Sequence, residues 1–283
     1  MIDETAEEIR QLQTHSSSEV AVKATRALES LLDREYATIE EFQTTFEQNA
    51  KVLRRANPSH AALQNAVRSV TDQVLAADVD DLDAARAHAQ TVIDEVVDDV
   101  ESGTREAAAH ASEFLDDGST LLTHDYSTTL LETLEQATAD GKHFDLYVTE
   151  ARPRFIGRKA ARTFSTLDGV SVTLITDSAG GHFLQACDRV VVGMDCIVDG
   201  VLYNRVGTFS LAAAAAQRDV PVTVLGAASK IIEDGFVFEN EHRPTSEVLA
   251  EPADGFDVAN PAYDATPISL LETIVTDDGI ERV

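Results

Sequence analysis

The chain has few cysteines and lysines for its length. Of its 283 residues, two are cysteine, Cys187 and Cys196, and neither has His or Cys neighbours at metal-ligand spacing. This scarcity excludes a disulfide framework and gives no zinc-site pattern, so we expect no metal. We expect both cysteines to be small buried apolar residues.

Long apolar runs are also absent. No segment approaches the roughly 18 consecutive apolar residues of a membrane span, and the start Met1-Ile2-Asp3-Glu4 has no basic and then apolar pattern. We therefore expect a soluble cytoplasmic protein with no membrane partner.

Positive charge is scarce compared with negative charge. The chain carries 50 acidic against 22 basic residues, a net charge of −28, and the acidic residues are spread along its whole length. Self-repulsion of this size is tolerable where salt shortens the Debye length to about 3 Å, near 1 M. The composition thus predicts a halophilic protein, and it disfavours direct binding of nucleic acid, which needs clustered Lys and Arg.

The period of the apolar residues changes near residue 115. Residues 1–115 show helical spacing and almost no strand signal, which predicts a helical bundle, with Asn57 and Pro58 opening one of its helices. Residues 116–283 alternate short apolar runs with helical segments, which predicts a doubly wound, Rossmann-like parallel sheet and an α/β fold class. We expect strands at 120–123, 144–148, 170–175, 189–192 and 221–225, and helices at 127–139, 156–167, 179–186 and 207–217.

Ligands of such a sheet bind beyond the carboxyl ends of its strands, so the loops there are the candidate site. No GxGxxG follows any expected strand, so we expect no NAD or FAD and no other cofactor. The candidate residues in these loops and just beyond are His124, Asp125, Arg152, Asp177, Ser178, His182, Asp195 and Arg205.

Each candidate has a structural alternative. Asp125 is either a ligand-site carboxylate or the cap of the helix that follows it, and Asp177 and Ser178 have the same two possibilities. A lone histidine such as His124 or His182 is more often structural than catalytic. Arg152, beside a proline, and Arg205, beside the expected helix start at 206–208, favour an anionic ligand such as a phosphate.

Several motifs in fixed order resemble the translation initiation factor 2B alpha/beta/delta subunit family. They are Thr123-His124-Asp125-Tyr126-Ser127, Tyr147–Pro153 with Gly157, Asp177-Ser178-Ala179, Val192-Gly193-Met194-Asp195, Gly200–Thr208 and Asn260–Pro267, with fainter likeness at Thr14–Ser18 and Arg54–Ser59. That family includes isomerases of methylthioribose 1-phosphate and ribose 1,5-bisphosphate. The resemblance implies an N-terminal helical domain, here 1–115, a Rossmann-like domain, here 116–283, and dimers that assemble further.

The resemblance also implies site residues. The isomerases use a cysteine after the first strand and the aspartate of a Gly-Ala-Asp motif as a proton-transfer pair. Here Asp195 keeps the aspartate, Met194 replaces the alanine and Asp125 stands in the place of the cysteine. Asn204-Arg205 replaces Asn-Lys, which keeps the charge and changes its shape. Cys196 cannot replace the thiol if it faces away from Asp195 along a strand.

Three hypotheses follow. The first is a non-catalytic or regulatory member that binds a sugar phosphate or nucleotide monophosphate at Arg152, Asn204, Arg205, His124 and His182. The alternative is an aldose-ketose isomerase resembling the ribose 1,5-bisphosphate enzyme, with Asp195 and Asp125 as its catalytic pair. The third is a structural paralogue that assembles with a relative. The expected partners are a phosphorylated small molecule, further copies in a homo-oligomer of two or more, and a paralogue or translation factor.

Overall fold

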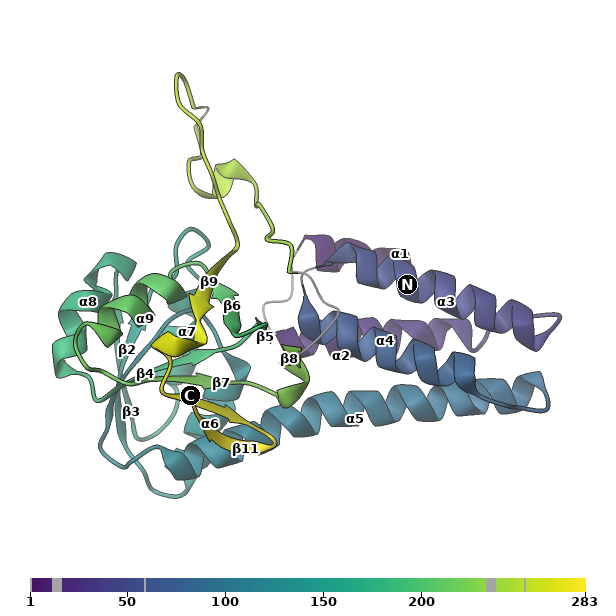
Figure 1. The fold of residues 1–283 in the computed structure, drawn as a ribbon, viewed down its shortest axis with the longest axis horizontal. Coiled ribbons are helices and arrows are strands. Elements are labelled where there is room, and N and C mark those ends of the chain that lie inside the picture. Colours follow the sequence, from purple (N-terminus) through teal and green to yellow (C-terminus); the bar gives the residue numbers. More distant parts are fainter. Residues whose placement is uncertain (1, 12–16, 59, 233–237, 252) are drawn as a thin grey trace. The chain divides into compact units, whose positions relative to one another are not determined.

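The chain folds into two compact units, Met1–Gly103 and Thr104–Val283. The structure, a computed structural model, describes residues 2–11, 17–58, 60–232, 238–251 and 253–283 (Figure 1). The division falls inside helix α5 (Leu82–Phe114), before the boundary that the change of period predicts near residue 115. It falls there because Ala111, near the end of α5, and Leu115 pack into the core of the second unit.

The first unit is helical. A single apolar core joins its helices, and α3 contributes Phe42, Phe46 and Leu53, which repeat at helical spacing. The elements before α5 are α1 (Ile2–Arg10), α2 (Ser17–Ala27), the 3₁₀ turn η1 (Leu28–Leu31), α3 (Ile39–Ala56) and α4 (Ala61–Ala76).

One predicted helix start in this unit is wrong. Asn57 closes α3 instead of opening the next helix, and α4 begins at Ala61 with His60 as its N-cap. The Nδ1 atom of His60 accepts a hydrogen bond from the backbone N–H of Leu63 at 3.2 Å. The apolar spacing of α3 continues to Ala56, and the next helix starts at Ala61, later than the Asn-Pro pair predicts. Residues 12–16, part of the Thr14–Ser18 likeness, lie outside the described residues.

The second unit is built on a seven-stranded sheet in the order β11-β10-β7-β4-β1-β2-β3. All its neighbouring strands are parallel except β10 and β11, so the predicted doubly wound parallel sheet is confirmed. Its strands are β1 (Thr120–Thr123), β2 (Phe144–Thr149), β3 (Val170–Ile175), β4 (Arg189–Gly193), β7 (Val222–Leu225), β10 (Thr273–Thr276) and β11 (Gly279–Arg282).

Helices cover both faces of this sheet (Figure 1). One apolar core joins the sheet to α6 and α7 through Leu130, Leu134 and Phe164, and the other joins it to α9 through Leu211 and Ala215. The helices and turns between the strands are α6 (Thr128–Ala139), α7 (Ile156–Phe164), η2 (Asp177–Ala179), α8 (Gly180–Phe183), η3 (Leu184–Ala186) and α9 (Thr208–Ala216).

A second, smaller sheet was not predicted. It has the order β8-β5-β6-β9 and lies in the chain partly between β4 and α9. Its strands are β5 (Cys196–Val198), β6 (Val201–Arg205), β8 (Ile231–Ile232) and β9 (Tyr263–Pro267), and further 3₁₀ turns are η4 (Ala228–Lys230), η5 (Thr245–Glu247) and η6 (Ile268–Leu270). Because β6 ends at Arg205 and α9 begins at Thr208, this sheet positions the Asn204-Arg205 pair.

The described residues contain no candidate membrane span and no candidate metal cluster. None of their helices combines the length and the apolar character that crossing a membrane requires. Within the same residues, no cluster of three or more His, Cys, Asp or Glu side chains could hold a metal ion.

Candidate functional site

The direction of the chain across the main sheet reverses between β1 and β4. From β1 the chain continues outward through β2 and β3, whereas from β4 it continues the other way through β7 and β10. Such a switch point opens a crevice at the carboxyl ends of the two strands. The residues that follow these ends are His124 and Asp125 after β1, and Met194 and Asp195 after β4.

Asp125 forms an ion pair and does not cap a helix. The N-cap of α6 is Ser127, whose side chain accepts a hydrogen bond from the backbone N–H of Leu130 at 3.2 Å. Asp125 has a left-handed backbone with φ of 68°, a conformation that Asp tolerates better than most residues. Its Oδ2 accepts a hydrogen bond from Nε of Arg205 at 3.0 Å, and both side chains are nearly buried.

Arg205 lies at the centre of this charge cluster. Its guanidinium group also lies over the ring of Tyr263, 5.1 Å from the ring centroid. Burial opposes the positive charge, but the carboxylates of Asp125 and Asp195 outweigh it and raise the pKa of Arg205. Two atoms of the ion pair, Nη1 of Arg205 and Oδ1 of Asp125, are buried without a hydrogen-bond partner among the described residues. Such atoms are costly unless a partner such as a water binds them.

Asp195 is surrounded by protein, although part of its surface stays accessible. Burial raises the pKa of this carboxyl group, and the negative charge of Asp125 acts in the same direction. Arg205 and Lys230 oppose the shift without cancelling it. Asp195 therefore keeps its proton to higher pH than an ordinary aspartate.

Lys230 is a site residue that the sequence analysis missed. It ends η4, only 5% of its surface is exposed, and its Nζ donates a hydrogen bond to the backbone carbonyl of Met194 at 3.1 Å. Burial lowers the pKa of Lys230, while Asp195 favours its charged form. Its place in the sequence could have identified it, because Lys230 follows the expected strand at 221–225. The loop after that strand was not among the candidate loops.

His124 and Asn204 are buried and have internal partners. His124 places Nδ1 2.7 Å from Oγ1 of Thr149 and Nε2 2.9 Å from the backbone carbonyl of Val206. Asn204 donates from Nδ2 to Oγ1 of Thr208 at 3.1 Å. Both side chains thus join the loop after β1 or the end of β6 to the start of α9, and their predicted ligand contacts stay predictions.

The start of α9 does not offer the anion site that the sequence predicted. The carboxylate of Asp264, on β9, already accepts hydrogen bonds from the backbone N–H groups of Gly207, at 2.7 Å, and Phe209, at 3.1 Å. An acidic side chain of the protein therefore occupies the place expected for a ligand phosphate.

Asp177 supports the loop that carries Arg152. Its carboxylate accepts hydrogen bonds from the backbone N–H groups of Ala151 and Arg152 at 2.8 and 2.7 Å, so Asp177 is not simply a helix cap. The Arg152 side chain is exposed and donates to the backbone carbonyl of Val248 at 3.3 Å. Together with Arg205 and Arg243 it lines a small cavity of about 10 Å³, room for roughly one water.

His182 lies apart from this cluster. It is exposed on α8 and meets the ring of Phe183 edge-on, with the ring centroids 5.0 Å apart. Among the described residues, no hydrogen bond, ion pair or ring contact joins His182 to Asp125, Arg205 or Asp195.

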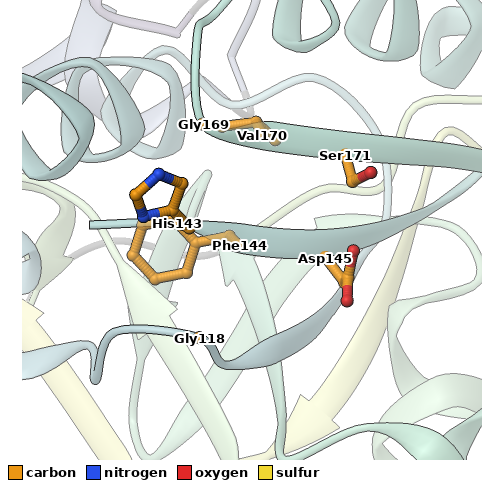
Figure 2. A pocket seen from close by; sticks show the side chains of 7 residues that line it. All are labelled: Gly118, His143, Phe144, Asp145, Gly169, Val170 and Ser171. Atoms are coloured by element: carbon orange, nitrogen blue, oxygen red, sulfur yellow. The ribbon is translucent and has the colours of Figure 1, made fainter. Parts of the chain in front are cut away.

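A larger cavity of about 400 Å³ opens at the carboxyl ends of β1 and β2, between the main sheet and α8 and α9. Its lining residues are His124, Thr149, Asp177, Ser178, Gly181, Gly207, Ser210, Leu211 and Ala214. Another, of about 380 Å³, lies at the opposite, amino ends of the strands, where Figure 2 shows His143, Phe144 and Asp145 below Gly169, Val170 and Ser171. The charge cluster belongs to the carboxyl edge, so the second cavity is not part of the candidate site.

Neither thiol of this chain can replace the cysteine that the resemblance implies for the isomerases. Cys187 and Cys196 are buried, and burial raises the pKa of Cys187 to about 11 and that of Cys196 to about 12. A thiolate is therefore not available from either residue near neutral pH.

Fold and site together define an α/β protein with a buried cluster of opposite charges at the switch point of a parallel sheet. The family model of the Initiation factor 2 subunit family matches residues 13–282, so this chain belongs to that family. The predicted family resemblance is confirmed.

Several proteins are similar to this chain over nearly its whole length. A ribose 1,5-bisphosphate isomerase of Haloterrigena turkmenica is 34% identical, over 97% of this chain and 88% of its own length. The translation initiation factor eIF-2B structure of Pyrococcus horikoshii OT3 matches with a TM-score of 0.85 and 24% identity, over 99% of this chain and 96% of that one. The tetrameric eIF2B-beta2-delta2 complex of C. thermophilum contains a chain that matches with a TM-score of 0.85 and 19% identity, over 98% of this chain and 90% of that one. The two structures show a shared fold.

Proposed function

We propose that this chain binds a ribose phosphate beside Asp125, Asp195, Arg205 and Lys230 and isomerises it from aldose to ketose. Of the hypotheses that the sequence leaves open, the full-length similarity to ribose 1,5-bisphosphate isomerase supports the isomerase better than the regulatory member. Translation initiation is supported by the fold and family alone.

One observation carries the catalytic proposal: two carboxyl groups at the switch point have unlike surroundings. Asp125 is the carboxylate of an ion pair with Arg205, whereas the pKa of Asp195 is raised. A carboxylate held in an ion pair with an arginine suits the role of base, and a carboxyl group that keeps its proton to higher pH suits the role of acid.

The reaction on ribose 1,5-bisphosphate needs one acid and one base. Asp195 gives its proton to the ring oxygen as the bond between that oxygen and C1 breaks. The hydrogen on C2 moves to C1 with its electron pair, and Asp125 takes the proton of the C2 hydroxyl group as the ketone forms. Every atom stays in the product, ribulose 1,5-bisphosphate, and Lys230 and Arg205 offer positive charge to the phosphate groups.

The test is conversion of ribose 1,5-bisphosphate followed by ³¹P NMR in high KCl. Turnover by the wild type and a loss of at least about a hundredfold in Asp195→Asn, within the usual range for a general acid, support the proposal. Far-UV circular dichroism of both proteins controls for folding. Absence of turnover by the folded wild type rejects the isomerase.

A second function, ligand binding without turnover, is favoured by the absence of a usable thiol. Cys196 is buried with a pKa raised to about 12, and an aspartate stands at position 125. Isothermal titration with ribose 1,5-bisphosphate and with AMP separates the two functions. Heat of binding without conversion supports the regulatory member, and no binding of either compound rejects both functions.

We also propose a homo-oligomer of two or more copies, because one structural relative is part of a tetrameric complex. Mass photometry of the purified chain tests it, and a uniform monomer contradicts it. A pull-down from native lysate at high salt tests the structural-paralogue hypothesis, which predicts a related chain in stoichiometric amount.

A further inference from the structure

Helix α7 and the loop before it carry a concentration of positive charge that is unusual for this chain. Between residues 151 and 167 there is no acidic residue, although the net charge of the chain is −28. The helix buries Ile156, Gly157, Ala160 and Phe164. Its exposed face and the loop carry Arg152, Arg158, Lys159 and Arg162, which we call the basic strip.

Most of this charge is not neutralised. Arg158 pairs with Glu150 at 2.8 Å, but the other three have no carboxylate partner among the described residues. Arg162 donates to the backbone carbonyl of Arg158, and Lys159 lies over the ring of Tyr126, with Nζ 4.3 Å from the centroid. Carbonyl and ring contacts leave the positive charge in place.

The basic strip begins at the candidate site. Tyr126, which Lys159 contacts, is the neighbour of Asp125 in the loop after β1. Arg152 and Ile156 line the same small cavity as Arg205. Along the helix axis, Arg162 is only about 9 Å from Ile156, close to the Debye length of about 8 Å at physiological ionic strength.

Positive charge beside the site would favour the approach of a phosphorylated sugar to this acidic chain. A ribose bisphosphate carries a charge of about −3 to −4, and the chain as a whole repels it. We propose that the basic strip attracts the phosphorylated ligand to the site through long-range electrostatics, and that Lys159 and Arg162 make no bond to it in the final complex. This inference rests on the proposed ligand class of the site.

The experiment compares two double variants of the full-length chain. Lys159→Glu/Arg162→Glu reverses the strip, and Arg218→Glu/Arg282→Glu makes the same change in net charge near the amino edge of the main sheet. The Kd of ribose 1,5-bisphosphate is measured by isothermal titration between about 0.15 and 1 M KCl. We expect the strip variant to bind about tenfold more weakly than the control variant at 0.15 M KCl, and less than about twofold more weakly at 1 M.

Equal Kd values for the two variants at every salt concentration would overturn the inference and leave the proposed function intact. A change of oligomeric state in the strip variant alone, seen by mass photometry, would overturn it in favour of an interface between copies. No binding by the wild type rejects the proposed function and the inference together. If a Glu variant unfolds at low salt, the matching Gln pairs are compared instead, with about a threefold difference expected.

Discussion

The ion pair between Asp125 and Arg205 determines what residue 125 can do. Oδ2 of the carboxylate accepts a hydrogen bond from Nε of Arg205 at 3.0 Å, while Oδ1 has no partner among the described residues. Arg205 would also stabilise any other anion placed there, including a thiolate, because a neighbouring cation favours the charged form.

Replacing Asp125 by cysteine restores the residue type that the resemblance implies for the isomerases. We predict that Asp125→Cys raises the rate of ribose 1,5-bisphosphate conversion by at least about tenfold over the wild type, because a thiol titrates closer to neutral pH. Asp125→Ser is the matched control, because serine is similar in size to cysteine and has no group that ionises near neutral pH. This variant should be slower than the wild type. A cysteine variant no faster than the serine variant contradicts the assignment of position 125 to proton transfer.

The raised pKa of Asp195 predicts a pH dependence of stability. The unfolded chain ionises this residue near its ordinary value of 3.8, before the folded chain does, so wild-type stability falls as pH rises from that value to the folded pKa. The change approaches at most about 1.4 kcal/mol for each pH unit within the window. Asp195→Asn should lack this loss.

Urea unfolding of the wild type and Asp195→Asn at several pH values measures the difference. The free energy of unfolding of the variant minus that of the wild type should be smallest below pH 3.8 and should grow as pH rises. A difference that stays constant from acid to neutral pH would mean that Asp195 ionises alike in both states.

Rules about strands and loops identify part of this site, but burial is not visible in a sequence. Asp125 and Asp195 follow the two strands at the switch point, so a strand pattern is enough to select them. The burial of Lys230, and its contact with the Met194 carbonyl, depend on η4 folding back from β7. The hydrogen bond from the backbone N–H of Gly207 to Asp264 likewise depends on long-range contact, because β6 pairs with β9 across a long stretch of chain.

At the scale of elements, buried parallel strands were easier to predict than the small sheet. Strand β4 carries the continuous apolar run Val190-Val191-Val192 because both of its faces are covered. Strand β6 is apolar only at Val201, Leu202 and Tyr203 before it ends in Asn204-Arg205, and β9 contains Asp264 and ends in Pro267. Both strands mix apolar and polar residues without strict alternation. Strand β6 pairs with β5 across Asp199-Gly200, which is a local hairpin signal. Strands β8 and β9 join this sheet from distant parts of the chain, and local sequence does not encode that pairing.

The junction between β6 and α9 depends on a glycine. Gly207 has φ of 116°, and a Cβ atom there would lie 2.7 Å from the ring of His124. Gly279, with φ of 124°, would place a Cβ atom in open space. Both positions disfavour an L side chain, but only Gly207 adds a clash with a buried side chain.

We predict that Gly207→Ala destabilises the protein by about 1 to 3 kcal/mol more than the control Gly279→Ala, because His124 must give up its bonds to Thr149 and Val206. The free energies of unfolding from urea titrations in high KCl give the comparison. Equal losses in the two variants would show that backbone strain alone is the cause and that His124 adjusts freely.

At the scale of the whole molecule, charge dominates. The net charge of −28 is spread over the chain, and α5 alone exposes Asp98, Asp99 and Glu101 within one turn of helix. Repulsion between such groups opposes the compact state, and mobile ions reduce it by shortening the Debye length from about 8 Å at physiological ionic strength to about 3 Å at 1 M.

We therefore predict that the melting temperature rises steeply with KCl up to about 1 M and more slowly beyond, because the Debye length is by then shorter than most charge separations. Sucrose at equal osmolality, which screens nothing, is the control for general exclusion effects. The triple variant Asp98→Asn/Asp99→Asn/Glu101→Gln removes three neighbouring charges from an exposed face, so its melting temperature should exceed that of the wild type at low salt and approach it at high salt. Differential scanning calorimetry measures both curves. Parallel curves for the wild type and the variant would show that KCl stabilises the fold by some means other than screening its acidic surface.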